Sequence, residues 1–225
     1  MLKRAIHVGA TAIAVAAVIA GAAACGQPEF TYVKNSGQKT YFKVPHTWHQ
    51  IGTSDLDDVL GGTNPDSAAS QVRQQLWWSV AYDASADPTP GHLLTNGVTE
   101  QPIVYARVAQ LTERQQNAVS LDMLRDLFLP VTADARQAAA EALPLTGFEL
   151  VHDEVINRPN GLHGIRVVYD YELGFGVLHT FDMTALVNND SSKLYLMIMR
   201  CSTSCYRERI SEMDTIATSF TVRGN

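Results

Sequence analysis

The second half of the chain alternates apolar and polar residues with a period of two, which is the pattern of β-strands. Four such segments follow one another, at residues 148–157, 165–173, 177–187 and 194–200. Short turns rich in glycine, asparagine and serine separate them, at residues 158–161, 174–176 and 188–192. The pattern therefore predicts an antiparallel meander of four strands.

Two of these segments predict how the sheet is covered. The segment 165–173 places an apolar face opposite the charged residues Arg166 and Asp170, which predicts a sheet covered on one side. Residues 194–199, in contrast, are apolar on both faces. This segment is predicted to be a central strand with layers above and below it.

The rest of the chain predicts few helices and several further strands. Strands are expected at residues 30–34 and 40–44, which a turn at 35–38 joins as a hairpin, and at 76–83, 102–111 and 219–222. Helices are expected at residues 121–129, 132–143 and 206–218. A long meander with few helices indicates the α+β class, with a central antiparallel meander sheet sandwiched by a few helices in a single domain at residues 30–225.

The first 25 residues have the features of an export signal. Lys3 and Arg4 precede an alanine-rich apolar run, and small residues close that run immediately before Cys25. A cysteine in this position resembles a bacterial lipobox, where the thiol is acylated and becomes the new N-terminus. We therefore expect a lipoprotein signal peptide at residues 1–24, a palmitate-bearing Cys25, and a tether at residues 25–29. This anchor would hold the domain on the extracytoplasmic face of the cell membrane.

Two other outcomes for this leader stay open. Lipoboxes most often have leucine three residues before the cysteine, where this chain has Ala22, and ordinary cleavage after Ala24 would release a soluble protein. An uncleaved membrane anchor is the other alternative, although alanine contributes less to membrane insertion than leucine or isoleucine does.

The cysteine count favours the lipoprotein interpretation. The chain has three cysteines, and an unpaired thiol is a liability in an oxidising compartment. Acylation of Cys25 would leave Cys201 and Cys205 as an even pair, which we expect to form a disulfide across a five-residue turn. A redox role is the alternative, but thioredoxin-type motifs have two residues between the cysteines, and here there are three.

Charge excludes some classes of partner. The leader holds two of the 17 basic residues and none of the 23 acidic ones, so the mature chain carries a formal charge of −8. The sequence also contains no cluster of Lys or Arg. Both features argue against nucleic acid and against peripheral binding to anionic lipid, because those partners select basic clusters.

Two short motifs resemble PsbP-like domains. The segment Tyr41-Phe-Lys-Val-Pro-His-Thr-Trp48 resembles their opening, where an apolar strand leads to a proline and then a tryptophan. A closing helix followed by Ser219-Phe-Thr-Val222 resembles their end. With the leader, the chain is similar to the PsbP-like bacterial lipoproteins over roughly residues 30–222. The resemblance implies a central antiparallel sheet sandwiched by helices. The photosystem and cation-related roles of plant members attach to residues that this chain does not match.

Candidate metal ligands are few and scattered. His46 and His49 stand three residues apart, but Pro45 makes a helix there unfavourable, and a pair of partly exposed histidines is the simpler interpretation. Three more histidines lie on the meander, where adjacent strands could bring two of them together: His152, His163 and His179. We interpret these as surface polar groups and expect no metal site and no cofactor.

Candidate catalytic residues are also lacking in the sequence. It contains no Gly-x-Ser-x-Gly elbow and no glycine-rich phosphate loop between a strand and a helix. We therefore expect no catalytic residues and interpret the protein as a non-enzyme.

The tryptophans are the remaining candidates for a ligand or partner surface: Trp48, Trp77 and Trp78. Trp77 and Trp78 are adjacent on one predicted strand, so they point to opposite faces of the sheet. One of them is expected to enter the core, and the other to lie under a helix or to line a ligand groove.

The sequence thus predicts a membrane-anchored, extracytoplasmic lipoprotein that acts as a non-catalytic binding or accessory module on an unknown envelope protein. The alternative is a small-ligand carrier with an apolar pocket between the sheet and the helices. Met197, Met199 or Tyr195 would line such a pocket. A packed interior with an exposed aromatic patch would favour the module.

Overall fold

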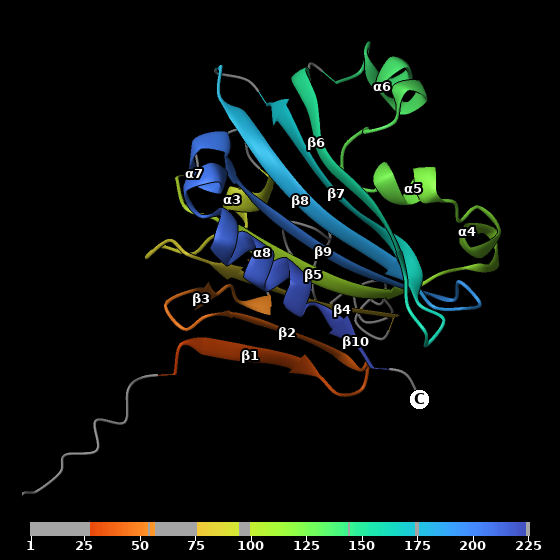
Figure 1. Ribbon diagram of the computed structural model, residues 1–225, viewed down its shortest axis with the longest axis horizontal. Coiled ribbons are helices and arrows are strands. Elements are labelled where there is room, and N and C mark those ends of the chain that lie inside the picture. The colour runs from red at the N-terminus through yellow and green to blue at the C-terminus, as the bar shows by residue number, and fades with distance from the viewer. Residues whose placement is uncertain are drawn as a thin grey trace, which may run out of the picture.

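Two antiparallel sheets form the framework of the protein (Figure 1). The computed structural model describes residues 28–53, 55–56, 76–94, 100–143, 145–173 and 176–223, so the predicted signal peptide and Cys25 lie outside the described residues. The larger sheet has seven strands in the order β3-β4-β5-β9-β8-β7-β6, and the smaller has three in the order β1-β2-β10. Strands β6 to β9 pair with one another in chain order, which confirms the predicted meander.

The larger sheet consists of β3 His49–Gln50, β4 Trp77–Asp83, β5 Ile103–Gln110, β6 Thr146–Asn157, β7 His163–Glu172, β8 Leu178–Val187 and β9 Lys193–Ser202. The smaller sheet consists of β1 Phe30–Asn35, β2 Thr40–Pro45 and β10 Thr221–Val222. The described helices are α3 Gly91–Leu94, α4 Glu113–Asn117, α5 Leu121–Arg125, α6 Ala133–Ala139, α7 Thr203–Glu208 and α8 Ile210–Ser219. The fold belongs to the α+β class, as predicted.

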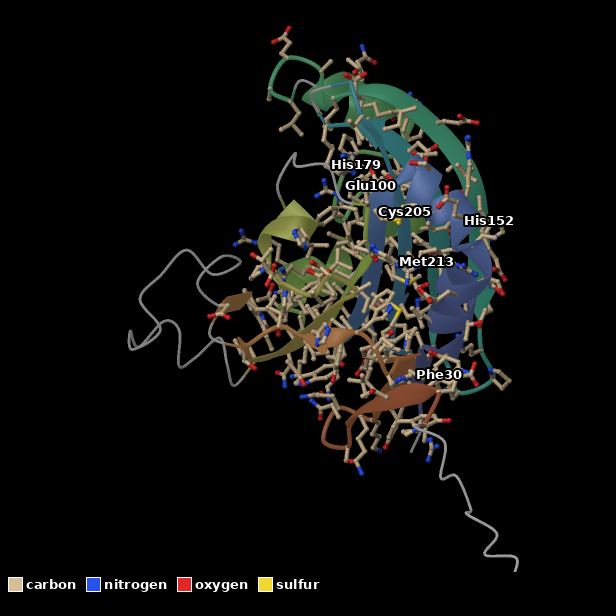
Figure 2. The ribbon with its side chains drawn as sticks, turned by 90° about the vertical axis from the view of Figure 1, so that its left-hand side faces the viewer. Phe30, Glu100, His152, His179, Cys205 and Met213 are labelled. Atoms are coloured by element: carbon tan, nitrogen blue, oxygen red, sulfur yellow. A yellow bond between two sulfur atoms is a disulfide. The ribbon has the colours of Figure 1, made fainter. Side chains whose placement is uncertain are left out.

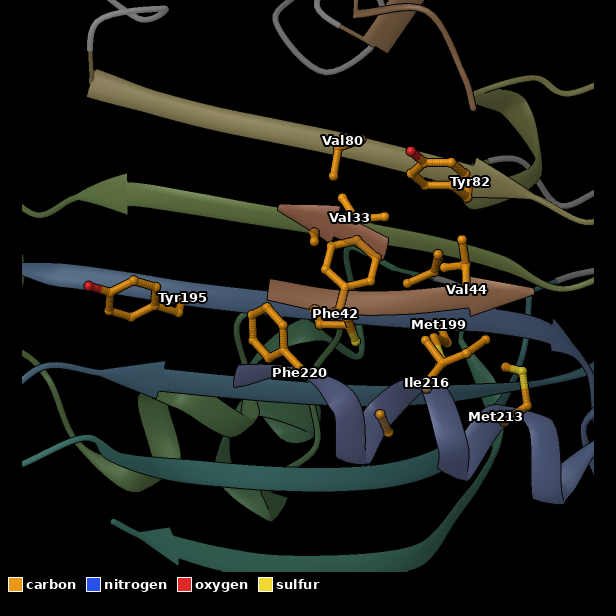
Figure 3. Close-up of a cluster of buried hydrophobic side chains, with 14 of the residues drawn as sticks. Val33, Phe42, Val44, Val80, Tyr82, Tyr195, Met199, Met213, Ile216 and Phe220 are labelled. Atoms are coloured by element: carbon orange, nitrogen blue, oxygen red, sulfur yellow. The ribbon is translucent and has the colours of Figure 1, made fainter. Parts of the chain in front are cut away.

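Strand β9 lies at the centre of the larger sheet and is apolar on both faces. One set of its side chains packs toward the smaller sheet and α8: Tyr195, Met197 and Met199. The alternate set packs into a second core on the opposite face: Leu194, Leu196 and Ile198. Figure 3 shows the first core, in which Phe42 of β2 and Ile216 of α8 meet Met199. The layers predicted on both sides of this strand are therefore present.

Helix α5 and the segment after it cover the opposite face of the sheet. The ring of Phe128 lies 5.7 Å from the ring of Phe181, and Tyr169 stacks on Phe181 with a centroid distance of 5.4 Å. The hydroxyl of Tyr171 donates a hydrogen bond to the carbonyl of Pro130 at 2.5 Å. These contacts close the second core over β7 and β8.

The prediction that β7 is covered on one side only is wrong. Arg166 lies on the face under α7 and α8, where its Nε and Nη2 donate to the Asp182 carboxylate at 3.1 and 2.9 Å. Its Nη1 donates to Asp214 of α8 at 2.8 Å, and the Tyr206 hydroxyl of α7 donates to Asp182 at 2.9 Å. A charged residue that pairs with a covering helix has the same sequence pattern as one in water, so periodicity alone could not distinguish them.

This ionic network fixes the C-terminal helices to the sheet. Burial opposes the charge of Arg166, but the hydrogen bonds and the charge of Asp182 raise its pKa overall. Burial, and next the charge of Asp182, raises the pKa of Tyr206. Both groups therefore stay protonated at neutral pH and keep donating to Asp182.

Several helices are shorter than the sequence predicts. Helix α5 ends at Arg125 because the carboxylate of Asp126 accepts the backbone N–H groups of Val131 and Thr132 at 2.7 and 2.8 Å, which turns the chain. Helix α6 likewise covers only part of its predicted range. None of the helices in the described part of the chain is long and apolar enough to cross a membrane.

The predicted helix at residues 206–218 is two helices, α7 and α8, which meet at Arg209. The change of direction at Arg209 allows both helices to bury apolar side chains. Helix α7 buries Tyr206, and α8 buries Met213 and Ile216 against the first core.

A disulfide joins the end of β9 to α7. It links Cys201 and Cys205, whose Cα atoms are 6.0 Å apart. The hydroxyl of Ser202 accepts the N–H of Cys205 at 3.2 Å and caps the first turn of α7. The bond therefore constrains the step from the central strand to the C-terminal helices.

Replacing both cysteines by serine should lower the free energy of unfolding by about 2 kcal/mol, because the bond closes a short loop in the unfolded chain. Denaturant unfolding with and without a reductant measures the effect. Reduction should destabilise the wild type by a similar amount and leave the Cys201→Ser/Cys205→Ser variant unchanged. Alkylation of both thiols in oxidised, denatured protein would contradict the pairing.

Candidate functional site

Three hairpin turns meet at the end of the molecule from which the C-terminus emerges, and they form a cleft of about 520 Å³ (Figure 1). These turns join β1 to β2, β6 to β7 and β8 to β9, and the end of β10 completes the wall. The lining residues are Gly37, Gln38, Lys39, Asn160, Leu162, Asn188, Asn189, Asp190, Lys193, Tyr195, Val222 and Arg223. This turn cleft has the volume of a small-molecule or peptide side-chain site.

Short polar side chains hold each turn in one conformation. In the β8–β9 turn, Asn188 accepts the N–H of Lys193 at 2.8 Å, and Asp190 accepts the N–H and the hydroxyl of Ser192 at 3.1 and 2.7 Å. In the β1–β2 turn, Asn35 accepts the N–H of Gln38 at 3.0 Å. The polar groups of the cleft are therefore positioned before any ligand arrives.

Two residues of these turns have the left-handed backbone conformation, which residues other than glycine rarely adopt. Lys39 has a φ of 53° and Ser191 has a φ of 54°. They are the positive-φ residues other than glycine in the described part of the chain, and both lie in turns of this cleft. The turns thus hold a costly local geometry at the place where they face one another.

Hydrogen bonds between distant segments join the turns. Lys193 Nζ donates to Gln38 Oε1 at 3.1 Å, across 155 positions of the sequence. Arg223 N donates to the carbonyl of Lys39 at 2.9 Å, and Asn160 Nδ2 donates to the carbonyl of Val222 at 3.1 Å. The cleft is consequently a product of the tertiary fold and of no single segment.

The cleft is positively charged although the chain as a whole is acidic. Lys39, Lys193 and Arg223 contribute three cations, and none of them forms an ion pair with a described residue. The opposing charge is Asp190, whose pKa is lowered by its hydrogen bonds with Ser192. Unpaired cations beside fixed polar groups are suited to binding an anionic or strongly polar group.

The lining of the cleft offers hydrogen-bond donors and acceptors from several elements. It contains no cysteine, serine or histidine. Burial, and next the charge of Asp190, raise the pKa of Tyr195, so its hydroxyl is a hydrogen-bond donor at neutral pH. The side-chain amides of Asn160 and Asn189 add neutral donors and acceptors.

The three tryptophans that are candidates for a ligand or partner surface lie in different surroundings. Trp48 is only 4 % exposed, because the chain turns after Pro45 and directs the indole into the first core. Trp77 and Trp78 are half-buried on opposite faces of β4, as their adjacency predicts. Trp78 packs against the first core, and the guanidinium of Arg107 lies 3.7 Å above the ring of Trp77. Cys25 lies outside the described residues.

The structure does not bring the histidines together. His46 and His49 are exposed, and Nδ1 of His163 lies 3.2 Å from a backbone carbonyl of its own turn. His152 is exposed on β6, whereas His179 is buried in β8 (Figure 2). In the ranges that the structure describes, no three His, Cys, Asp or Glu side chains are arranged to hold a metal ion.

His179 and Arg200 are two buried polar residues whose burial the sequence pattern did not reveal. Neither ring nitrogen of His179 has a hydrogen-bond partner among the described residues, and burial, with the nearby charge of Arg200, lowers its pKa to about 4. Arg200 donates from Nη1 to the carbonyl of Leu93 at 2.7 Å. Burial lowers the pKa of Arg200 to about 10, which leaves it charged at neutral pH.

A second buried charge, Asp83, holds the segment before α3. Its carboxylate accepts the N–H groups of Ser85 and Thr89 at 2.8 and 3.3 Å and pairs with Nδ1 of His92. These bonds satisfy a fully buried carboxylate and fix a loop, which is a structural role.

Comparisons with known proteins find similarity in the fold and none in the sequence. No protein-family model matches the sequence, and no curated protein matches it. The solution structure of cyanobacterial PsbP (CyanoP) from Synechocystis sp. PCC 6803 is similar with a TM-score of 0.50 and 12 % identity, over 91 % of this chain and 99 % of that one. The Ran-binding protein Mog1p of Saccharomyces cerevisiae has a TM-score of 0.42 and 9 % identity, over 87 % and 96 %. The chain therefore has a PsbP-like fold.

The buried imidazole of His179 should make stability depend on pH. Its pKa is about 4 in the folded protein and near 6.5 when unfolded, so the unfolded chain binds a proton below pH 6.5 that the folded chain does not. The free energy of unfolding is unaffected by protonation of this residue above pH 6.5. As the pH falls from 6.5 to 4, protonation of His179 in the unfolded chain lowers the free energy of unfolding by up to about 3 kcal/mol.

Unfolding of the wild type and of His179→Leu between pH 4 and 7 tests this. The variant should show a flatter profile, and His152→Leu, which changes an exposed histidine on β6, should match the wild type. Parallel profiles for all three proteins would contradict the expectation.

Proposed function

We propose that this protein is a non-catalytic binding or accessory module of the cell envelope, anchored to the outer face of a membrane by acylated Cys25. The turn cleft is its binding site. The observation that carries the proposal is the group of three cations without ion pairs, Lys39, Lys193 and Arg223, in a rigid cleft of about 520 Å³.

The chemistry of the cleft favours an anionic group on a partner, such as the acidic side chains of an envelope protein. Charge-assisted hydrogen bonds from Lys and Arg to a carboxylate are stronger than neutral ones. Because Gln38 holds the Lys193 ammonium and the ring of Tyr41 lies against the Arg223 guanidinium, binding requires little ordering of these two cations. The lining contains no cysteine, serine or histidine, which supports a binding role over a catalytic one.

The packing of the interior favours this module over the small-ligand carrier. Met197 and Met199 would line the carrier's pocket, but both are buried in the first core with Phe42 and Phe220. Side chains occupy the space where the carrier would need a cavity. Tyr195 also lies in this core, and it additionally borders the turn cleft.

The anchor can be tested by changing the cysteine that carries it. Cys25→Ala should move the protein out of the membrane fraction or arrest it as a precursor, because the acylated thiol would be its attachment. Cell fractionation with an antibody measures the distribution. The Cys201→Ser/Cys205→Ser variant is the control and should stay with the membrane. Cys25→Ala protein that stays with membranes washed in high salt, after leader cleavage, would refute the anchor.

Binding at the turn cleft can be tested by crosslinking from Asn189, which lines it. A photo-crosslinking amino acid at this position in the membrane-tethered protein should form an adduct with a partner protein. The same amino acid at Asp134, on exposed α6, should not. The double variant Lys39→Glu/Lys193→Glu should abolish the adduct, because each substitution reverses the charge of a cation that would hold the partner.

The matched control for that charge reversal is Arg114→Glu/Arg207→Glu, which changes the net charge equally at exposed residues that do not line the cleft. An adduct that survives the cleft substitutions, or that forms equally from Asp134, would remove the cleft from the proposal. An adduct with the mass of a small molecule would favour the carrier.

A further inference from the structure

The smaller sheet has one face in the first core and one face toward solvent. Val33, Phe42 and Val44 point inward (Figure 3). The alternate residues form the outer sheet face: Phe30, Tyr32, Lys34, Tyr41, Lys43 and Arg223. This face is the part of the smaller sheet that no other described element covers.

The outer sheet face carries positive charge only. Strands β1, β2 and β10 contain neither Asp nor Glu, and Lys34, Lys43 and Arg223 form no ion pair with any residue of the described ranges. The mature chain has a charge of −8, so acidic residues have been kept off this face while they dominate elsewhere. An anionic surface is the complementary partner.

Aromatic rings alternate with these cations. Tyr32 pairs across the strands with Lys43, and Lys34 pairs with Tyr41. Lys43 Nζ lies 3.9 Å from the centre of the Phe30 ring, and the guanidinium of Arg223 lies 4.6 Å from that of Tyr41. Aromatic residues beside Lys and Arg are the composition of protein surfaces that lie at lipid headgroups.

Two further features fit a headgroup layer. Tyr32 is 76 % exposed, so its ring is free to contact a headgroup layer. A hollow of about 280 Å³ on the same face is lined by Lys34, Lys43 and Arg223 among others, and it is large enough to receive a phosphate group.

The outer sheet face begins a few residues after Cys25, the residue that we expect to carry the lipid. Strand β1 begins at Phe30, five residues after Cys25. Five residues span at most about 17 Å when fully extended. Acylation of Cys25 would therefore hold the start of β1 within a short distance of the bilayer, where attraction between Lys or Arg and anionic lipid acts.

We propose that the outer sheet face lies against the anionic headgroups of the membrane to which Cys25 ties the protein. The inference rests on the proposed anchor and adds the orientation of the domain, with the aromatic rings at headgroup level and the cations on lipid phosphates. A second copy of the chain is a poor occupant, because two such faces would repel each other.

The test measures the affinity of the face without the acyl chain. The mature chain, residues 25–225 with Cys25→Ser, is sedimented with vesicles of phosphatidylcholine or of phosphatidylcholine containing 30 % phosphatidylglycerol. We expect the protein to bind the anionic vesicles and not the neutral ones, and to dissociate as salt is raised. Lys34→Ala/Lys43→Ala should lower the partition coefficient by about 30-fold.

Two charge-matched variants locate the binding. Arg114→Ala/Arg207→Ala should bind like the parent, and Lys39→Ala/Lys193→Ala, in the turn cleft, should retain most of the binding. Equal partition on both vesicle types, or equal losses in all three variants, would overturn the proposal. A loss confined to the cleft variant would assign the lipid to the cleft and also overturn it. Circular dichroism checks that each variant is folded.

These outcomes are separate from the fate of the anchor. If the anchor is right and the face is wrong, the acylated wild type stays in the membrane fraction of cells while the unacylated chain binds neither vesicle. If the face is right and Cys25 is not acylated, both proteins bind anionic vesicles and both are released by salt.

Discussion

The structure depends on the need to cover both faces of the seven-stranded sheet. Strand β9 presents apolar side chains on each face, and exposing either set to water would cost roughly 1.5–3 kcal/mol for each large side chain. On one face, α5 and the segment after it close the core. On the other, α7, α8 and the smaller sheet do so, and the pairing of Arg166 with Asp182 and Asp214 holds the helices there. The outer sheet face belongs to this second layer, and the turn cleft lies where the smaller sheet meets the turns of the larger one.

Local patterns predicted the elements better than they predicted what covers them. The two-faced apolar pattern of residues 194–199 identified the central strand because it depends on the strand alone. The pattern around Arg166 could not predict that a helix covers this residue, because its partner Asp214 lies 48 residues later in the chain, on α8. Helix α4 was missed although a signal was present: Thr112 and Gln115 form a capping box, which the sequence spells as Thr-x-x-Gln.

The candidate site illustrates the same limit. Lys39 and Arg223 are 184 positions apart, and each is an isolated basic residue in the sequence. They meet because β10 pairs with β2, a register that no local pattern specifies. The sequence therefore contains no basic cluster, whereas the fold brings isolated cations together at the surface. Trp48, a candidate for a ligand or partner surface, is buried, because the chain turns after Pro45 and directs the indole into the first core.

The pairing of β10 with β2 also sets an order of folding. Thr221 lies opposite Tyr41, so the last strand of the chain completes a sheet that the first hairpin begins. Contacts between such distant segments form slowly, because the intervening loop must first be closed. A chain that emerges N-terminus first would therefore present its opening hairpin as an unfinished two-stranded ribbon until the final residues arrive. The wall of the turn cleft would be completed at the same moment, because Val222 and Arg223 form part of it.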